Sequence, residues 1–487
     1  MRGATRCYIG ASTPWYAAVT YRVAMADPAV FEDPGPPDPQ PPSRGRRALT
    51  VALLVTLIVS IVVLAFVSGR GVINVGPVVP PPASVSAASP NTSRLAIVDS
   101  SGRLMTSDAS GGSVVPYGAA GIAFTFPAWS PDGSRLAVIG QGVEGSGVYV
   151  FTVRDAGAAG IDPAIVYRST DRPPFYLYWA PDSRRVTFLT TEPDGIALRL
   201  APADGSAPSA VIRTGAPMYW AWVDRDRLLI HSGGAGPDGF LGELGVDGIS
   251  VEPDVIVPGG FRAPAVTSDG RSRAFVTPGD GTPAQVVVEA RDRSNPHALD
   301  VFGAAALDFG PGTDEVAFVA PAVAGRDTAV PIGPLRLMKA GTGEVRTLLA
   351  GAVVAFFWAP DGRTIAALEI PGTGDGQVAS TVDARLAASA GASPTPHPGV
   401  ALRLLFVGVD SGSIRSQRAV RVSATFVEQV IPFFDQYALS HRVWSADGTA
   451  VVLPVVADDG SDRLETVPAD GSEARPVGDG VIGFWSP

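Results

Sequence analysis

The sequence predicts an all-β protein, an eight-bladed β-propeller closed by its own two ends and preceded by one transmembrane helix. Three observations lead to this prediction. Residues 48–67 form a long apolar run without a charge. After residue 91 a short Trp-containing motif returns at roughly the 40–50-residue period of propeller blades. The last residues hold one half of that motif, and the residues from Asn91 onward hold the other half.

The apolar run at 48–69 predicts a transmembrane signal anchor. Its core, ALTVALLVTLIVSIVVLAFV, has the length that spans a hydrocarbon layer of about 30 Å. Three arginines precede it and only Arg70 follows closely, so the positive-inside rule places the N-terminus in the cytoplasm and the rest outside. A cleaved signal peptide is the alternative, but the run is longer than usual and no small-residue cleavage site follows promptly.

The segments on either side of the anchor, residues 1–47 and 70–90, are not expected to fold into a hydrophobic core. Residues 1–47 end in a Pro- and Asp-rich stretch, which predicts a disordered cytoplasmic tail, with Met1 or Met25 as the start. Residues 70–90 are rich in Pro and Ser and predict an extended linker. The single cysteine, Cys7, precedes the anchor, so we expect no disulfide framework in the exported part. The chain has one lysine, Lys339, which favours a GC-rich bacterial source.

Charge excludes one class of partner. The net charge is −10 and the isoelectric point is near 5.0, whereas nucleic-acid binding needs a basic face. We therefore expect no nucleic acid as a partner. The low charged content and the many Gly and Pro residues are typical of short strands joined by tight turns.

The repeats lie in residues 91–487. The clear copies are PAWSPDGSRLAVIG at 127–140, YWAPDSRRVTFLT at 178–190, MYWAWVDRDRLLIHS at 218–232, FWAPDGRTIAALE at 357–369 and VWSADGTAVVLPV at 443–455; weaker copies stand at 265–277 and 308–320. In each copy a short apolar strand ends in Trp or a substitute, a turn follows, and an alternating strand leaves it. Within the turn, Pro fixes the backbone angle φ of the first central residue, and the Asp side chain accepts hydrogen bonds from the nearby backbone. Gly adopts the positive φ that completes the hairpin.

The two ends predict closure of the ring. Trp485-Ser486-Pro487 joined to residues 91–98 reads as one complete motif, so the two ends are expected to share one sheet, without open edges. Eight inner strands follow, ending at Trp129, Trp179, Trp222, Val266, Phe309, Trp358, Trp444 and Trp485. Seven blades are the alternative. The long interval between Trp358 and Trp444 is interpreted as one blade with insertions at about 372–399 and 424–440.

The W-S-P-D-G-S-R-L-A-V copy at 129–138, with its partners at 179, 358 and 444, resembles the WD-like repeats of the TolB propeller family. The resemblance covers about residues 91–487 and implies a fold rather than an activity, because such propellers serve as binding modules, as gating domains of peptidases and in uncharacterised exported proteins. TolB itself is a soluble periplasmic protein with an additional α/β domain. Here an anchor stands in its place, which argues against a role in the Tol system.

The sequence shows no catalytic constellation. No G-x-S-x-G pentapeptide is present, and the four histidines, His231, His297, His397 and His441, lack ligand spacing. The turn aspartates Asp132, Asp182, Asp361 and Asp447 fall in separate blades and are interpreted as turn formers. We expect no cofactor, metal or catalytic residue, and a noncatalytic protein- or ligand-binding module. The alternative is a lyase or hydrolase with its active site at the channel mouth.

Binding is expected at the loops that connect each outer strand to the next inner strand, since these surround one mouth of the channel. Aromatic and Arg side chains there are typical hot-spot residues. The candidates are Arg172, Phe175, Tyr176, Phe261, Arg262, Phe433, Phe434 and Tyr437. The apolar insertion at 424–440 could either bind a partner or plug the channel. The partner is expected to be an unknown envelope protein or ligand, bound to a monomeric propeller outside the cell membrane.

Overall fold

The computed structural model describes residues 93–155, 162–193, 195–251, 256–279, 284–321, 331–372 and 399–487. The predicted tail (1–47), anchor (48–69) and linker (70–90) lie outside these residues, as does nearly all of the predicted insertion at 372–399. Within the described ranges, no helix is both long and apolar enough to span a bilayer.

The described chain forms antiparallel sheets in which each strand pairs with its neighbours in sequence. One sheet contains β4 (Ala123–Trp129), β5 (Arg135–Gly142), β6 (Gly145–Thr152) and β7 (Ala164–Ser169). The next contains β8 (Pro174–Trp179), β9 (Arg185–Glu192), β10 (Gly195–Pro202) and β11 (Ala210–Gly215). β12 (Met218–Asp224), β13 (Arg227–Ser232) and β14 (Phe240–Gly245) form a third. β15 (Ala265–Val266), β16 (Ser272–Thr277), β17 (Ala284–Ala290) and β18 (His297–Val301) form a fourth.

The following strands are linked into one long sheet. It runs through β19 (Ala306–Phe309), β20 (Glu315–Val319), β21 (Gly333–Lys339), β22 (Val345–Trp358), β23 (Thr364–Glu369), β24 (Val400–Gly408), β25 (Ile414–Val422), β26 (Ala450–Val456), β27 (Asp462–Pro468) and β28 (Arg475–Asp479). β22 makes one link because it pairs first with β21 and, from Val353 onward, with β23. A single pair, Val422 with Val455, joins β25 to β26.

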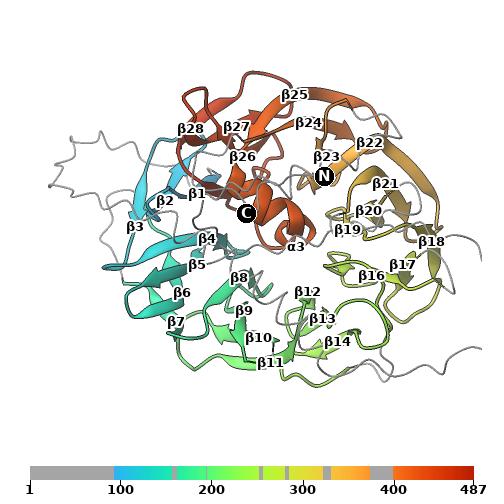
Figure 1. The fold of residues 1–487 in the computed structure, drawn as a ribbon, viewed down its shortest axis with the longest axis horizontal. Coiled ribbons are helices and arrows are strands. Elements are labelled where there is room, and N and C mark those ends of the chain that lie inside the picture. Colours follow the sequence, from blue (N-terminus) through green and yellow to red (C-terminus); the bar gives the residue numbers. More distant parts are fainter. Residues whose placement is uncertain are drawn as a thin grey trace, which may run out of the picture. The chain divides into compact units, whose positions relative to one another are not determined.

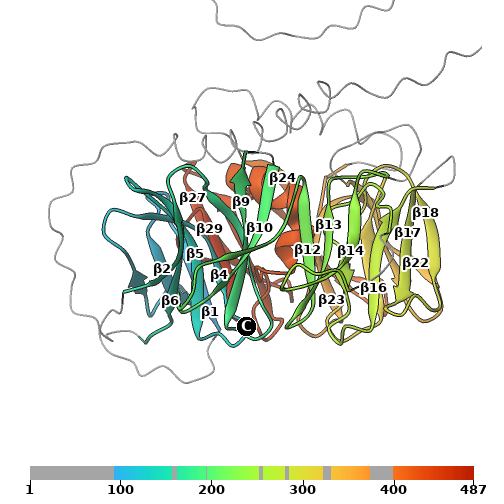
Figure 2. The ribbon, with the colours of Figure 1, turned by 90° about the horizontal axis from the view of Figure 1, so that it is seen from below.

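The sheets stand around a common centre, as Figure 1 shows. Their innermost strands touch in succession: β29 (Ile482–Trp485) contacts β4, β4 contacts β8, and β15 contacts both β12 and β19. Figure 2 shows the strands side by side when the ring is viewed edge-on. The apolar faces of neighbouring sheets are thereby buried against one another, which explains the alternating pattern of the repeats.

The two ends of the described chain share one sheet, as the sequence predicts. This sheet contains β29, β1 (Arg94–Val98), β2 (Leu104–Asp108) and β3 (Val115–Tyr117). Leu95 lies opposite Trp485 in the register. The Arg94 backbone N–H donates to Ser486 Oγ at 3.0 Å, and the Ser486 N–H donates to the Arg94 carbonyl at 2.8 Å. Strand pairing therefore holds the two ends together.

The predicted turn role of the motif aspartates is confirmed. Asp132 Oδ1 accepts a hydrogen bond from the Ser134 N–H at 3.0 Å, and Asp361 and Asp447 make the equivalent bond to the residue two positions later. Gly133 has φ +70°. In the A-P-D-S copy, Ser183 replaces the glycine and adopts φ 58°. These aspartates thus complete hairpins.

The motif tryptophans connect neighbouring inner strands by hydrogen bonds as well as by packing. In four copies the indole Nε1–H donates to the carbonyl of the residue just before the motif aromatic of a neighbouring inner strand. The pairs are Trp129 with Phe484 (3.1 Å), Trp179 with Ala128 (2.9 Å), Trp358 with Asp308 (3.2 Å) and Trp444 with Phe357 (2.9 Å). Packing alone would accept other aromatic residues at these positions, whereas this hydrogen bond requires the indole.

The insertion at 424–440 lies in the middle of the ring, where Figure 1 shows its helix α3. It contains a π-helical turn at Phe426–Val430, a 3₁₀ turn at Ile431–Phe433 and α3 (Phe434–Ala438). Phe426, Val430 and Phe434 belong to the largest hydrophobic core. Of the two interpretations left open by the sequence, this packing supports a plug, and we name residues 426–438 the central plug.

Candidate functional site

One cavity lies between the central plug and the first residues of β4, β8 and β12. We name it the crossover pocket; its volume is about 190 Å³ and its walls are mostly apolar. Its aromatic lining residues are Phe126, Phe175, Tyr176, Tyr219, Phe433 and Tyr437. The chain enters β8 and β12 here from the preceding outer strands, so the pocket lies at the predicted mouth.

Two of these aromatic residues have a strained backbone. Phe126 has φ +50° and Tyr176 has φ +52°, each three residues before the motif tryptophan of its strand. At both positions the pairing to the next strand shifts register, as in a β-bulge. The rings of Phe126 and Tyr176 lie 5.6 Å and 5.3 Å from the Tyr437 ring. A left-handed conformation costs a bulky residue about 1–2 kcal/mol, and such strain is concentrated at functional sites.

A buried polar network fixes Tyr176 to the plug. Its hydroxyl donates to the Gln436 carbonyl at 2.5 Å, accepts from Gln436 Nε2 at 2.9 Å and lies 2.8 Å from Ser440 Oγ. Ser440 Oγ in turn lies 2.6 Å from His441 Nδ1. Burial raises the pKa of Tyr176 well above its ordinary value, so the phenol stays neutral.

Two polar residues of the plug anchor it to β12 and to the segment just before β15. Gln436 Oε1 accepts from the Trp220 N–H at 3.0 Å and Gln436 Nε2 donates to the Trp220 carbonyl at 2.9 Å, so the amide pairs with β12 as another strand would. Asp435 Oδ2 accepts from the Ala263 N–H at 3.2 Å. Sequence reasoning missed both roles; the available signal was a pair of adjacent polar residues between aromatic residues of the insertion.

The eight predicted binding residues divide into two groups. Four line the crossover pocket: Phe175, Tyr176, Phe433 and Tyr437. The other four have different surroundings: Arg172 pairs with Glu192 at 2.8 Å, Phe261 stacks on His231 at 4.3 Å, the Arg262 guanidinium lies 5.4 Å from the Phe433 ring, and Phe434 is buried 5.1 Å from the Phe356 ring. Phe261 and Phe434 therefore act as packing residues here.

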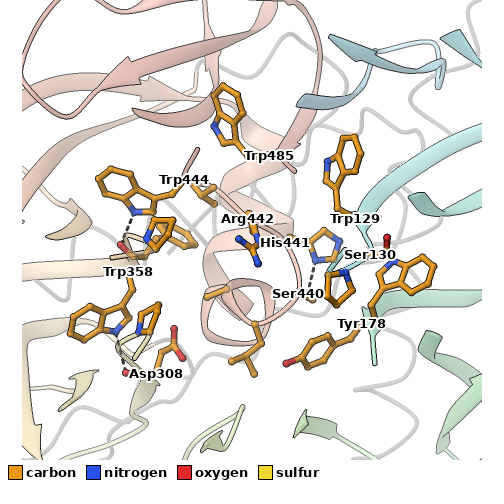
Figure 3. Close-up of a pocket in the computed structure, with 18 residues that line it drawn as sticks. Trp129, Ser130, Tyr178, Asp308, Trp358, Ser440, His441, Arg442, Trp444 and Trp485 are labelled. Carbon is orange, nitrogen blue, oxygen red and sulfur yellow. Dashed lines mark hydrogen bonds between the residues drawn. The ribbon is translucent and has the colours of Figure 1, made fainter. Parts of the chain in front are cut away.

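A second cavity lies at the opposite ends of the inner strands, between the motif tryptophans and the C-terminal end of the plug (Figure 3). We name it the channel cavity; its volume is about 350 Å³. Figure 3 shows Arg442 near the middle of the view, with Trp129, Trp358, Trp444 and Trp485 around it. The motif prolines Pro131, Pro311 and Pro360 also line it. Sequence reasoning missed this cavity because its polar residues belong to no shared motif.

The channel cavity has unusual electrostatics. Burial, together with the nearby charge of Asp435, raises the pKa of Asp308 to about 8. Burial also raises the pKa of Asp435, although Arg262 opposes this effect. His441 is buried, and the loss of hydration lowers its pKa to about 3, so it is neutral at physiological pH. In the described part of the chain, no group of three or more His, Cys, Asp or Glu residues could hold a metal.

The ring of antiparallel sheets, its shared terminal sheet and its central cavities define this protein as a β-propeller. No family model matches the sequence, and no curated protein matches it.

The comparisons with solved structures show distant structural similarity to several propellers. The dihydro-heme d1 dehydrogenase NirN is 13% identical, with a TM-score of 0.50 over 83% of this chain and 77% of that chain. A putative TolB from Agrobacterium tumefaciens is 14% identical, with a TM-score of 0.33 over 67% of this chain and 88% of that chain. The C-terminal WD40 domain of Sif2 is 11% identical, with a TM-score of 0.43 over 75% of this chain and 90% of that chain. Likeness at these identities shows the fold alone.

Proposed function

We propose that this protein is a noncatalytic binding module of the bacterial envelope. In this proposal an eight-bladed TolB-like propeller is held outside the cell membrane by residues 48–69 and binds a partner protein at the crossover pocket. The observation that carries the proposal is the convergence of Phe175, Tyr176, Phe433 and Tyr437 on one apolar cavity. Aromatic residues in desolvated pockets are the usual anchors of protein interfaces.

The size of the pocket favours one kind of occupant. Small-molecule sites usually measure roughly 300–1,000 Å³. The crossover pocket, at about 190 Å³, suits a single large apolar side chain presented by a partner. The strained Phe126 and Tyr176 backbones support the same conclusion, since the chain tolerates their cost while directing both rings toward the plug.

The proposal of eight blades rests on the inner strands. Seven of the predicted inner-strand residues lie in β4, β8, β12, β15, β19, β22 and β29, and the eighth, Trp444, forms an isolated bridge to Val451 in β26. The membrane anchor is supported by the sequence of residues 48–69 and its flanking arginines.

Site-specific photocrosslinking in intact cells tests the binding proposal. A photoreactive phenylalanine analogue replaces Phe433 in the full chain, and the same analogue replaces Val211, which is 46% exposed on the outer strand β11, as the control. We expect a discrete adduct from position 433 only. Leu189→Trp, which fills the pocket, should reduce that adduct by at least about tenfold, the effect of losing a hot-spot contact.

Two outcomes would contradict the proposal. One is an identical adduct from positions 433 and 211, which indicates nonspecific proximity. The other is an adduct that persists in a folded Leu189→Trp protein. If Leu189→Trp reduces expression, Phe175→Ala enlarges the pocket instead and should also weaken the adduct.

An enzyme is the second candidate, and one observation favours it. Asp308 and His441 both line the channel cavity, and Asp308, with a pKa of about 8, is suited to act as a general acid. A lyase or hydrolase activity would then reside in the channel cavity. Chromogenic esters, glycosides and uronides, offered to the wild type and to Asp308→Asn, test it. Turnover lost in the variant supports this candidate, whereas no turnover, or equal turnover, contradicts it.

A further inference from the structure

Arg442 is a cation without a counter-ion inside the channel cavity. Its backbone is fixed because its carbonyl accepts from the Trp485 N–H at 2.8 Å. Its side chain lines the cavity and remains solvent-exposed there, while partial desolvation by the surrounding protein lowers its pKa. Among the described residues, the guanidinium has no ion pair or hydrogen bond. Because the guanidinium is accessible and unpaired, it is available to an anion that enters the cavity.

Two less exposed arginines of the chain are compensated by carboxylates. Arg273, which is 1% exposed, pairs with Glu289 at 2.7 Å, and Arg199 pairs with Glu192 at 2.9 Å. Arg442 therefore departs from the way these arginines are accommodated. An arginine held in this way is suited to an anion that arrives from outside.

The acidic residue of the same cavity does not fill that role. Asp308 makes no ion pair with Arg442, and its raised pKa leaves it mostly protonated at neutral pH. Two titratable groups interact electrostatically with Asp308: Asp435 on the plug, which raises the pKa of Asp308, and Tyr178 on β8, whose own pKa is raised by burial. A protonated Asp308 and a neutral phenol are hydrogen-bond donors, so at neutral pH the polar part of the cavity favours an anion.

The remaining walls are flat and apolar. They include the rings of Trp129, Trp358, Pro131 and Pro360. A volume of about 350 Å³ lies within the range of small-molecule sites, roughly 300–1,000 Å³. A hydrated inorganic anion would leave these rings without a partner, whereas a carboxylate attached to an apolar body would use both parts of the cavity. The planar guanidinium fork also matches a carboxylate in a bidentate arrangement.

We infer that the channel cavity binds a small organic carboxylate, with the carboxylate on Arg442 and the apolar body among the motif tryptophans and prolines. This site is independent of the proposed partner-binding function. It lies at the other end of the inner strands and shares no lining residue with the crossover pocket.

Titration of the full chain in detergent micelles tests the inference. The probes are benzoate and hexanoate, with benzamide as the neutral isostere of benzoate and inorganic phosphate as the anion without an apolar body. Tryptophan fluorescence reports binding because several indoles line the cavity. We expect saturable binding of a carboxylate and at least about tenfold weaker binding of benzamide, the effect of losing a charge-assisted hydrogen bond.

Variants locate the site. Arg442→Gln should weaken carboxylate binding at least about tenfold, whereas Arg184→Gln, the same charge change at an exposed turn, should leave it unchanged. Raising the pH through about 8 should weaken binding to the wild type as Asp308 ionises, and should not do so in Asp308→Asn.

Three outcomes would overturn the inference: neither carboxylate binds saturably, benzamide or phosphate binds as tightly as benzoate, or Arg442→Gln binds as tightly as the wild type. The comparison of benzoate with benzamide needs no variant, so it decides the matter even where Arg442→Gln fails to fold.

Discussion

Replacing Asp308 with Asn should remove a pH dependence of stability that the channel cavity creates. Burial and the neighbouring Asp435 raise the pKa of Asp308 to about 8, against 3.8 for an ordinary Asp. The folded protein therefore holds a proton that the unfolded chain has lost over the interval between these values. Because the folded state binds more protons there, stability falls as pH rises, by up to about 1.4 kcal/mol per pH unit. Asn mimics the protonated acid without titrating.

The effect is large enough to measure by thermal unfolding. Between about pH 6 and about pH 7.5 this single group lowers the wild-type stability by up to about 2 kcal/mol. For a cooperative propeller of this size, that is a shift of about 2 °C in the unfolding midpoint. The shift should be absent in Asp308→Asn, which becomes the more stable protein above about pH 8.

An exposed turn aspartate supplies the control. Hydrogen bonds from Ser206 lower the pKa of Asp204, so Asp204→Asn should leave the slope between about pH 6 and about pH 7.5 unchanged. If Asp308→Asn and the wild type show the same pH dependence in this interval, Asp308 is not protonated in the folded state and the reasoning about the channel cavity is wrong.

Three further predictions concern packing and the plug. Trp358→Phe should lower the free energy of unfolding by about 1–3 kcal/mol in chemical unfolding, and by more than Trp222→Phe does. Of these two indoles, Trp358 donates a hydrogen bond to Asp308, whereas the Trp222 N–H has no partner among the described residues. Equal losses would count against a contribution of the Trp358 bond. Gln436→Ala should lower the free energy of unfolding by about 2 kcal/mol or more and speed hydrogen exchange at the Trp220 amide, with Gln429→Ala as the milder control. Unchanged exchange at Trp220 would contradict the role of Gln436 in holding the plug to β12. His441 is neutral in the folded protein because its pKa there is about 3, below the unfolded value, so wild-type stability should decrease as pH falls below about 6.5, by up to about 1.4 kcal/mol per pH unit. His441→Gln should lack this decrease. An equal decrease in the variant would contradict the assignment to His441.

The candidate site was only partly predictable from residue type. Aromatic residues near the mouth were identified by their chemistry, and Phe175 and Phe433 do line the crossover pocket. Phe434 has the same chemistry and a neighbouring position, yet it faces Phe356 and is buried. Which face of a short helical segment meets a cavity depends on what surrounds it, and the sequence of the segment does not state this.

The sequence by itself determined the repeated hairpins and the joining of the two ends. The hydrogen bonds that form each turn, such as that from the Ser134 N–H to Asp132, connect residues only a few positions apart. The two halves of the motif, at Trp485 and Leu95, can be recognised directly in the amino-acid sequence. Only the tertiary structure decided the position of the plug, the strained backbones at Phe126 and Tyr176, and the pairing of Tyr176 with Gln436, which stand 260 positions apart. Local turns depend on adjacent residues, whereas a pocket depends on distant side chains whose positions are fixed only when the whole core packs.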